Sequence, residues 1–215
     1  DQYRMYSESI LITQQSKSMN DVFHVSVPGT LSQLIPVESI NLIEEITITG
    51  SLNKTDYDFL NTLPILKRVD LSGLTDVTIP SNAFYNSVIE NPTISTVILP
   101  LNLIEISDYA FYKSSIISID IPPTVKRIGA HAFDNSKITS LIIPNSIEHI
   151  ENNAFASTYN LRGNIIIPNT TTFIGECAFQ HSNFDGTLTL GSGIKEIGPS
   201  AFQACHNVKG DLIIP

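Results

Sequence analysis

The chain has no tryptophan, only two cysteines among its 215 residues, and few basic side chains: 12 Lys and Arg stand against 21 Asp and Glu, for a formal charge of -9. Without clustered Lys and Arg, we expect no nucleic-acid partner, because binding to phosphate backbones depends on such clusters. No apolar run reaches the roughly 18 residues that a spanning helix needs, so we expect no transmembrane segment in this chain. Since 42% of the residues are hydrophobic, a disordered chain is also excluded.

The acidic residues are concentrated in the first half of the chain. Residues 1–110 hold 13 acidic and 5 basic side chains, a net charge of -8, whereas residues 111–215 hold 8 and 7, a net charge of -1. This asymmetry has two interpretations, a solvated surface or two regions of different kind.

Three short elements recur in a fixed order. The dipeptide Ala-Phe appears at 83–84, 110–111, 132–133, 154–155, 178–179 and 201–202, at spacings of 27, 22, 22, 24 and 23 residues. An apolar triplet, closed by proline in all cases but one, appears at 97–99, 119–121, 141–143, 165–167, 188–190 and 212–214. A third element of the form Ile/Val-x-x-Ile, often followed by glycine, comes next, as at 125–129. A globular β-sandwich would instead show turn signals every 8–12 residues without this fixed phase.

Each element has a physical interpretation. The triplet alternates with the period of a strand, and proline ends it. We expect the third element to turn the chain across the back of each coil, with Gly129, Gly175 and Gly198 at a position that suits a positive φ. Ser107 and Glu151 hold that position in two other repeats, so a positive φ is not obligatory there. The phenylalanines should stack as a ladder on the convex side, and the position three residues after each should admit only small side chains. That position holds Ser87, Ser114, Ser136, Thr158, Ser182 and Cys205.

Repeats of 22–24 residues with one strand each bury their apolar faces only by stacking. The sequence therefore predicts a repeat solenoid of the leucine-rich-repeat type, a right-handed β/α coil with a short parallel sheet on one face and turns and short helical segments on the other. Residues 1–80 read as a leader and strand–helix–strand cap, with strands at 45–50 and 68–73 and a helix capped by Thr55 between them. Residues 81–215 are the repeats, the last one incomplete.

The repeats at 116–133 and 138–155 resemble the BspA-type leucine-rich repeat of surface proteins from gut and oral Bacteroidetes and from mucosal protists. The segments 46–53, 56–60 and 69–73 resemble the N-terminal part of the Bacteroidetes members. The resemblance covers roughly residues 22–215. It implies secretion or surface anchoring, and binding of host proteins, extracellular matrix or other cells. The family often has cysteine three residues after the phenylalanine, which only Cys205 matches here, and no ligand residues carry over.

The sequence offers little catalytic or metal-binding chemistry. It contains no nucleophile elbow, phosphate-binding loop or zinc-protease motif, so we expect no enzyme, no cofactor and no metal site. Cys177 and Cys205 fall on different layers of adjacent coils, which predicts two free thiols. The histidines at 131, 149, 181 and 206 occupy four different repeat positions and cannot form one column.

The middle residue of each triplet should point outward from the sheet. In strand order these positions hold Thr47, Asp70, Ile98, Asp120, Ile142, Ile166, Thr189 and Ile213. Four isoleucines stand where a face open to water favours polar residues, so either β-propensity alone selects them or the stripe is a partner surface. The candidate partner-binding residues are Asp70, Ile98, Asp120, Ile142, Ile166, Thr189 and Ile213.

The function predicted from these observations is a secreted or cell-surface adhesion protein, anchored as a lipoprotein before Asp1 or free, that binds a protein or glycan through the strand face. The alternative is a structural spacer in a larger surface protein. The last triplet, from Leu212 to Ile214, leaves an unpaired edge, so we expect either a fragment of a longer solenoid or a dimer formed through that edge.

Overall fold

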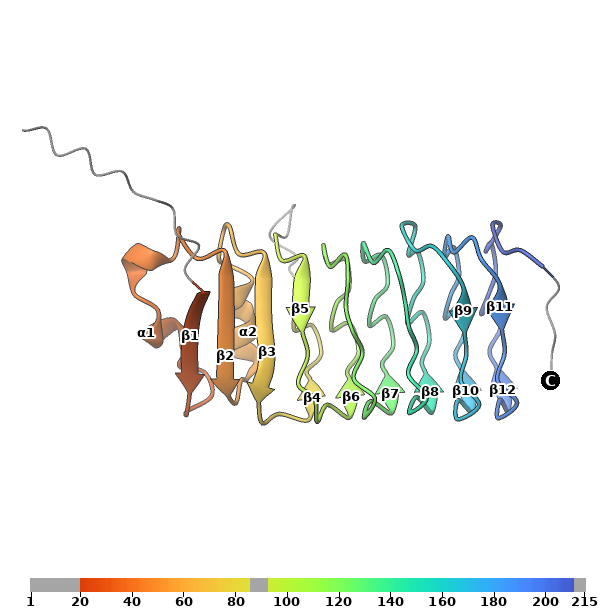
Figure 1. Cartoon of the computed structure of the whole chain (residues 1–215), viewed down its shortest axis with the longest axis horizontal. Coiled ribbons are helices and arrows are strands. Elements are labelled where there is room, and N and C mark those ends of the chain that lie inside the picture. The colour runs from red at the N-terminus through yellow and green to blue at the C-terminus, as the bar shows by residue number, and fades with distance from the viewer. Residues whose placement is uncertain (1–19, 86–92, 211–215) are drawn as a thin grey trace, which may run out of the picture.

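The chain winds into a stack of coils in which all paired strands run parallel (Figure 1). The structure is a computed structural model that describes residues 20–85 and 93–210. The expected edge strand from Leu212 to Ile214 and the small side chain of Ser87 lie outside these ranges. The prediction of a repeat solenoid is confirmed.

The first coils carry the longer elements. These are β1 (Asn20–Val25), α1 (Leu31–Leu34), the 3-10 turn Val37–Ser39, β2 (Glu45–Gly50), α2 (Lys54–Leu60) and β3 (Arg68–Leu74). Strands of two or three residues follow: β4 (Thr78–Ile79), β5 (Thr96–Ile98), β6 (Glu105–Ile106), β7 (Arg127–Ile128), β8 (His149–Ile150), β9 (Ile165–Ile166), β10 (Phe173–Ile174), β11 (Leu188–Thr189) and β12 (Glu196–Ile197). Because β3 pairs with both β2 and β5, the leader continues the same stack, and a boundary at residue 80 stays a prediction.

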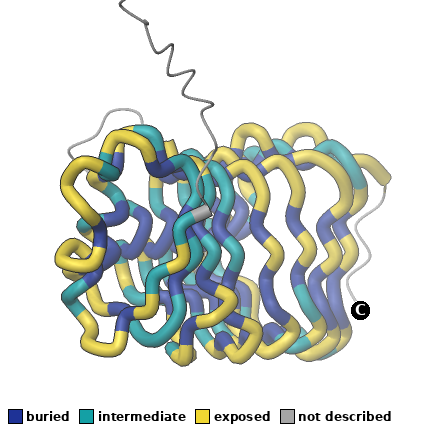
Figure 2. The backbone as a smooth tube through the Cα atoms, turned by 60° about the vertical axis from the view of Figure 1, so that its left-hand side comes forward, coloured by how far each residue is buried: buried dark blue, intermediate teal, exposed yellow. Residues whose placement is uncertain are grey.

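Each coil has three sides. The strand face carries the sheet β1-β2-β3-β5, the pair β9-β11, and the triplets 119–121 and 141–143 between them. The back face carries the sheet β4-β6-β7-β8-β10-β12. The Ala-Phe turns form the third side, the turn face. Figure 2 shows buried segments recurring at the same point of successive coils, with exposed segments between them.

The third element of the repeat is not the turn that we expected. It forms the six strands of the back-face sheet, whose register aligns one column of isoleucines: Ile79, Ile106, Ile128, Ile150, Ile174 and Ile197. Conversely, the triplets 119–121 and 141–143 are not strands, and within the described residues their backbone groups make no hydrogen bond to a neighbouring coil. The most continuous hydrogen-bonded ladder therefore lies opposite the sheet that the sequence predicted.

The positive φ that Gly129, Gly175 and Gly198 would permit does not occur, since none of the three is among the residues with positive φ. Their role is close packing. A Cβ built on Gly129 would lie 2.5 Å from the backbone nitrogen of Asp108 in the preceding coil. Glycine is required here because the two backbones touch.

The left-handed backbone instead occurs in the turn face, at non-glycine residues. It recurs just before Ala-Phe and two residues after the phenylalanine, at Asn82, Tyr109, Lys113, His131, Asn135, Asn153, Ser157, Cys177, His181, Ser200 and Ala204. This conformation turns alternate N–H groups toward the next coil, as in the bonds from Tyr109 to Ala130 (2.8 Å) and from Phe111 to Ala132 (2.7 Å). The inter-coil bonds offset the cost of the left-handed conformation, about 1–2 kcal/mol per residue.

The predicted phenylalanine ladder is confirmed, and it runs through the interior. The rings of Phe84, Phe111, Phe133, Phe155, Phe179 and Phe202 stack at centroid distances of 5.0 to 5.3 Å. The described residues at the small position are buried, apart from the partly exposed Cys205. Ser182 Oγ donates to the Phe155 carbonyl at 2.7 Å, which ties the small position to the ladder.

Helix α2 closes the first end of the ladder. Its N-cap is Asn53, rather than Thr55 as expected, and Asp56 completes a capping box. The buried Asp56 carboxylate also accepts the N–H groups of Gly29 (2.6 Å) and Leu31 (2.9 Å). Asn61 Nδ2 donates to the carbonyl of Ala83 at 2.8 Å, a bond that the turn of a preceding coil would otherwise supply. The cap thus reproduces with side chains what a further coil would provide.

The ring of Tyr57 packs edge-on against Phe84 at 5.5 Å, but its buried hydroxyl has no hydrogen-bond partner among the described residues. Burial and the nearby Asp76 and Asp56 raise the pKa of Tyr57 well above its usual range. We expect Tyr57→Phe to raise the free energy of unfolding by about 1 kcal/mol, because it keeps the ring contact and removes an unpaired polar atom. Guanidinium denaturation measures this, and a loss of stability would show that the hydroxyl is bonded in solution.

Candidate partner-binding face

The structure brings the described candidate residues into one column on the strand face. Asp70 is in register with Thr47 and Ile98, and Ile166 is in register with Thr189. The bridge between Thr96 and Ser118 aligns Ile98 with Asp120, which stand two residues further along their respective segments. Ile213 lies outside the described residues.

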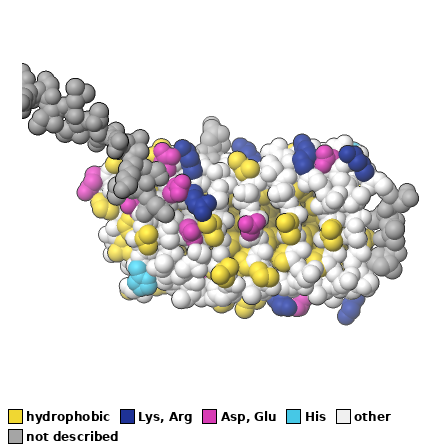
Figure 3. All heavy atoms as spheres, in the orientation of Figure 1, with side chains coloured by type: hydrophobic (Ala, Val, Ile, Leu, Met, Phe, Trp, Pro, Cys, Tyr) yellow, Lys and Arg dark blue, Asp and Glu magenta, His cyan; other side chains and the backbone are white. Residues whose placement is uncertain are grey.

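The outward residues of this column are exposed from Asp120 onward. Ile98 is partly buried, whereas Ile142 is 80% exposed and Ile166 60% exposed. Their triplet neighbours Leu141, Ile143 and Ile165 are buried, as the alternation predicted. Figure 3 shows hydrophobic side chains gathered along the middle of this face, with many of the charged side chains nearer its upper and lower edges. The face is therefore apolar where solvent contact would favour polar residues.

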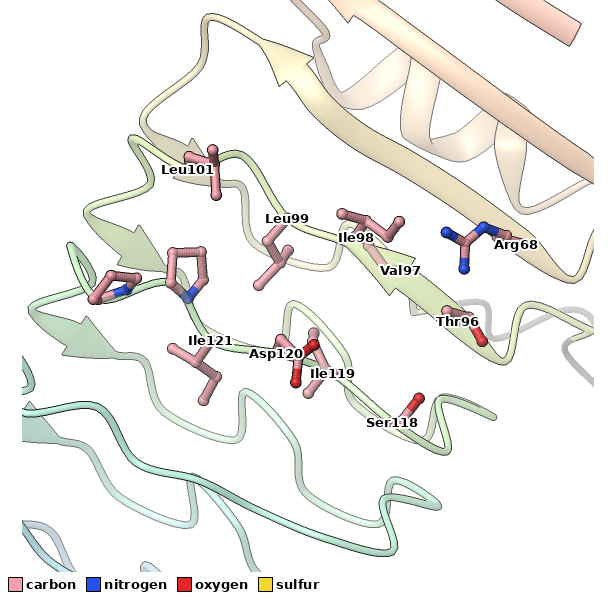
Figure 4. Close-up of a pocket in the computed structure, with 12 residues that line it drawn as sticks. Arg68, Thr96, Val97, Ile98, Leu99, Leu101, Ser118, Ile119, Asp120 and Ile121 are labelled. Carbon is pink, nitrogen blue, oxygen red and sulfur yellow. The ribbon is translucent and has the colours of Figure 1, made fainter. Parts of the chain in front are cut away.

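A groove of about 520 Å3 opens on this face between β5 and the next coil. Figure 4 shows Thr96 and Ile98 on one side and Ser118 and Asp120 on the other, with Arg68 near one end. The walls are mostly apolar, from Val97, Leu99, Leu101, Ile119, Ile121, Pro122 and Pro123. The groove lies where the sheet pairing of β5 stops at the bridge to Ser118, so the loss of pairing opens the surface there.

Two of the groove residues, Ile98 and Asp120, are candidates from the sequence, but the remaining lining was missed. Thr96 and Ser118 stand two residues before Ile98 and Asp120, so the same period of two could have found them. Arg68 and Leu101 had no such signal. Arg68 reaches the groove from β3 in the preceding coil, and Leu101 follows Pro100 at the end of its triplet.

The two basic residues at the start of β3 each lie near a carboxylate, whereas Asp120 has no partner within the described residues. Lys67 Nζ lies 2.8 Å from Glu44, and Arg68 Nε lies 4.0 Å from Glu45. Within the described part of the chain, the exposed carboxylate of Asp120 has no hydrogen-bond or ion-pair partner. Asp70 accepts the N–H of Ser72 at 2.9 Å and has no cationic partner within the described ranges. Arg68 and Asp120 are the charged residues of the groove lining, so its formal charge is zero, and Asp120 is the one of the two without a partner among the described residues.

The back face has its own charged cluster, but that cluster is self-contained. Arg127 donates to Glu105 at 2.9 Å, to Asp108 at 3.0 Å and to Glu151 at 3.0 Å, and so joins three successive coils. Burial lowers the pKa of Arg127, but its hydrogen bonds to Asp108 and Glu151 raise that pKa more strongly. Because its donors are engaged within the stack, the cluster stabilises coil stacking rather than offering a free cation.

The turn face carries aromatic side chains that the sequence analysis did not single out. The rings of Tyr85, Tyr109, Tyr112 and His131 contact one another at centroid distances between 4.6 and 6.2 Å. These rings pack on one another and form a small aromatic cluster on the turn face.

Both cysteines are free thiols, as predicted. Burial, with the negative charge of Glu176, raises the pKa of the Cys177 thiol, and burial raises that of Cys205 to about 11. Neither thiol is therefore activated as a nucleophile. In residues 20–85 and 93–210, no group of three or more His, Cys, Asp or Glu side chains is arranged to hold a metal ion, and no helix is long and apolar enough to cross a bilayer.

Six copies of the sequence model for the BspA type leucine rich repeat region match residues 77–209. Among solved structures, a leucine rich cell surface protein from Faecalibacterium prausnitzii A2-165 is 21% identical over 78% of this chain, with a TM-score of 0.39. The match covers 51% of that protein, so the chain spans about half its length. A leucine-rich repeat protein from Bacteroides ovatus ATCC 8483 is 16% identical, with a TM-score of 0.29. The match covers 79% of this chain and 72% of that protein. A comparison with curated proteins found no match.

Proposed function

Because the chain belongs to the BspA-type leucine-rich repeat family, whose six copies cover residues 77–209, we propose that it is a binding module of a secreted or cell-surface protein. Leucine-rich repeat families are generally non-catalytic and mediate protein binding. The module binds a protein or glycan partner through the strand face, and it performs no chemistry on that partner.

The observation that carries this proposal is the apolar stripe beside the groove. Ile142 and Ile166 expose 80% and 60% of their surface, and the groove of about 520 Å3 lies one coil away at Asp120. Apolar surface that remains in water lowers the free energy of association by roughly 25 cal/mol per Å2 once a partner covers it. β-Propensity explains isoleucine in a strand, but residues 141–143 form no strand, which weakens that interpretation for Ile142.

We expect the double variant Ile142→Lys, Ile166→Lys to fold normally and to lose partner binding, because both side chains point into solvent and the lysines would have to be desolvated in a complex. The measurement is surface plasmon resonance of the 215-residue chain against an immobilised panel of purified extracellular-matrix proteins and mucin glycans. The expected loss for a panel member that binds the wild-type chain is at least about tenfold in affinity.

Ile104→Lys is the matched control, since Ile104 is 48% exposed and lies directly before β6 on the back face. Loss of binding in the double variant, with binding retained in the control, supports the strand face as the site. Unchanged binding in the double variant would contradict it. A wild-type chain that binds no member of the panel would favour the spacer function.

A further inference from the structure

The coil spacing sets which conformation of a partner can follow the column of outward residues. Consecutive rings of the phenylalanine ladder lie 5.0 to 5.3 Å apart, which measures the rise from one coil to the next. The column from Asp70 to Thr189 advances one residue per coil, through Ile98, Asp120, Ile142 and Ile166. A partner that lies along the stack must therefore present one side chain about every 5 Å.

An α-helix meets this spacing and an extended strand does not. One helical turn rises about 5.4 Å, so residues spaced three and four apart would reach successive coils. In a strand, the side chains on one face are roughly 6.6 Å apart, so they would fall out of step with the coils after two positions. Five coil spacings correspond to a helix of roughly 17 residues.

The charges of the column select the composition of that helix. Asp70 and Asp120 are two coils apart and have no cationic partner within the described residues, whereas Lys67 lies 2.8 Å from Glu44 and Arg68 lies 4.0 Å from Glu45. The other positions, Ile98, Ile142 and Ile166, are apolar. A complementary surface therefore has basic side chains two turns apart and apolar side chains at the remaining turns.

We propose that the strand face binds a basic amphipathic helix of a partner protein, which lies along the stack of coils. This inference rests on the proposed function. Lys or Arg side chains of the helix pair with Asp70 and Asp120, the second of them at the groove. Aliphatic side chains cover Ile98, Ile142 and Ile166. Positions spaced by three and four alternately, as in a heptad, give the required register, because 3.5 residues rise about 5.2 Å.

The test uses a synthetic alanine-rich peptide of 18 residues as the probe. It carries lysines at its second and ninth positions and leucines at its fifth, twelfth and sixteenth. A second peptide of the same composition alternates lysine and leucine with a period of two, and a third has glutamate in place of lysine. Fluorescence anisotropy at 50 mM and 500 mM salt gives the affinities, and circular dichroism gives the helicity of each peptide with and without the 215-residue chain.

We expect the first peptide to bind and gain helicity, and the other two to bind at least about tenfold more weakly. Asp120→Lys should lower the affinity for the first peptide by about tenfold at 50 mM salt and by less at 500 mM salt, because salt screens the charges. The same variant should bind the glutamate peptide more tightly, because charges at an interface set which partner is favoured. The matched control is Asp58→Lys, since Asp58 lies outside the column on helix α2 and is exposed.

Equal binding of the first and second peptides, or an unchanged affinity in Asp120→Lys, would overturn the inference. Failure of this inference can be distinguished from failure of the proposed function. If the Ile142→Lys, Ile166→Lys variant loses a matrix protein or glycan that the wild-type chain binds while no helical peptide binds, the strand face is a binding site for something other than a basic helix. If that variant binds as the wild-type chain does, both proposals are wrong.

Discussion

Replacing Phe133 by alanine is expected to lower the free energy of unfolding by about 3–5 kcal/mol, the range measured when a large buried ring is removed from a core. Phe133 is fully buried and stacks on Phe111 at 5.0 Å and on Phe155 at 5.2 Å. The variant loses both ring contacts and leaves a cavity in the middle of the ladder. Because hydrogen bonds such as those from Phe111 to Ala132 and from Phe133 to Ala154 hold neighbouring coils in register, the backbone cannot move inward to fill this cavity without breaking them.

Guanidinium denaturation followed by circular dichroism measures the loss. Phe173→Ala is the matched control, because Phe173 is a partly exposed phenylalanine of β10 on the back face and lies outside the ladder, and its removal should cost about 1 kcal/mol or less. Similar losses in both variants would mean that the ladder is not the main source of cohesion between coils.

Replacing Gly129 by alanine is expected to destabilise the protein by about 3 kcal/mol, at the upper end of the usual cost of overpacking. The added methyl group would lie 2.5 Å from the backbone nitrogen of Asp108 and equally close to its Oδ1. The side chain could rotate away, but the backbone could not, because Gly129 donates its own N–H to Ile106 in the same preceding coil at 2.8 Å. The two coils would have to separate at the back-face sheet.

Gly163→Ala separates this steric explanation from a conformational one. Gly163 has a φ of +84 degrees, but a Cβ there would meet no atom within 4 Å. Alanine at this position should cost only about 1–2 kcal/mol, from the left-handed conformation alone. The thermal midpoints of the two variants provide the comparison. A smaller loss for Gly129→Ala than for Gly163→Ala would argue against contact between the coils at Gly129.

The candidate site was only partly accessible from the sequence. The period of two within each triplet identified Ile98, Asp120, Ile142 and Ile166 as outward residues, because strand geometry alternates whatever the neighbours are. It could not identify Arg68 and Leu101 as groove residues, since they come from a different coil and from beyond a proline. It also could not identify Lys67 and Arg68 as already paired, because their partners stand 23 residues earlier in the chain.

The sequence alone determined the repeat, its phase, the stacked phenylalanines and the two free thiols. These follow from identity at a fixed spacing, since residues at equivalent positions of successive coils must meet when the coils stack. The tertiary structure decided which side of the coil carries the continuous sheet and why the glycines are there. Both depend on how closely neighbouring backbones approach: at Gly129 the approach excludes a Cβ, whereas at residues 119–121 and 141–143 the backbones form no hydrogen bonds between coils. The spacing between coils is a property of the whole stack, so no single repeat contains it.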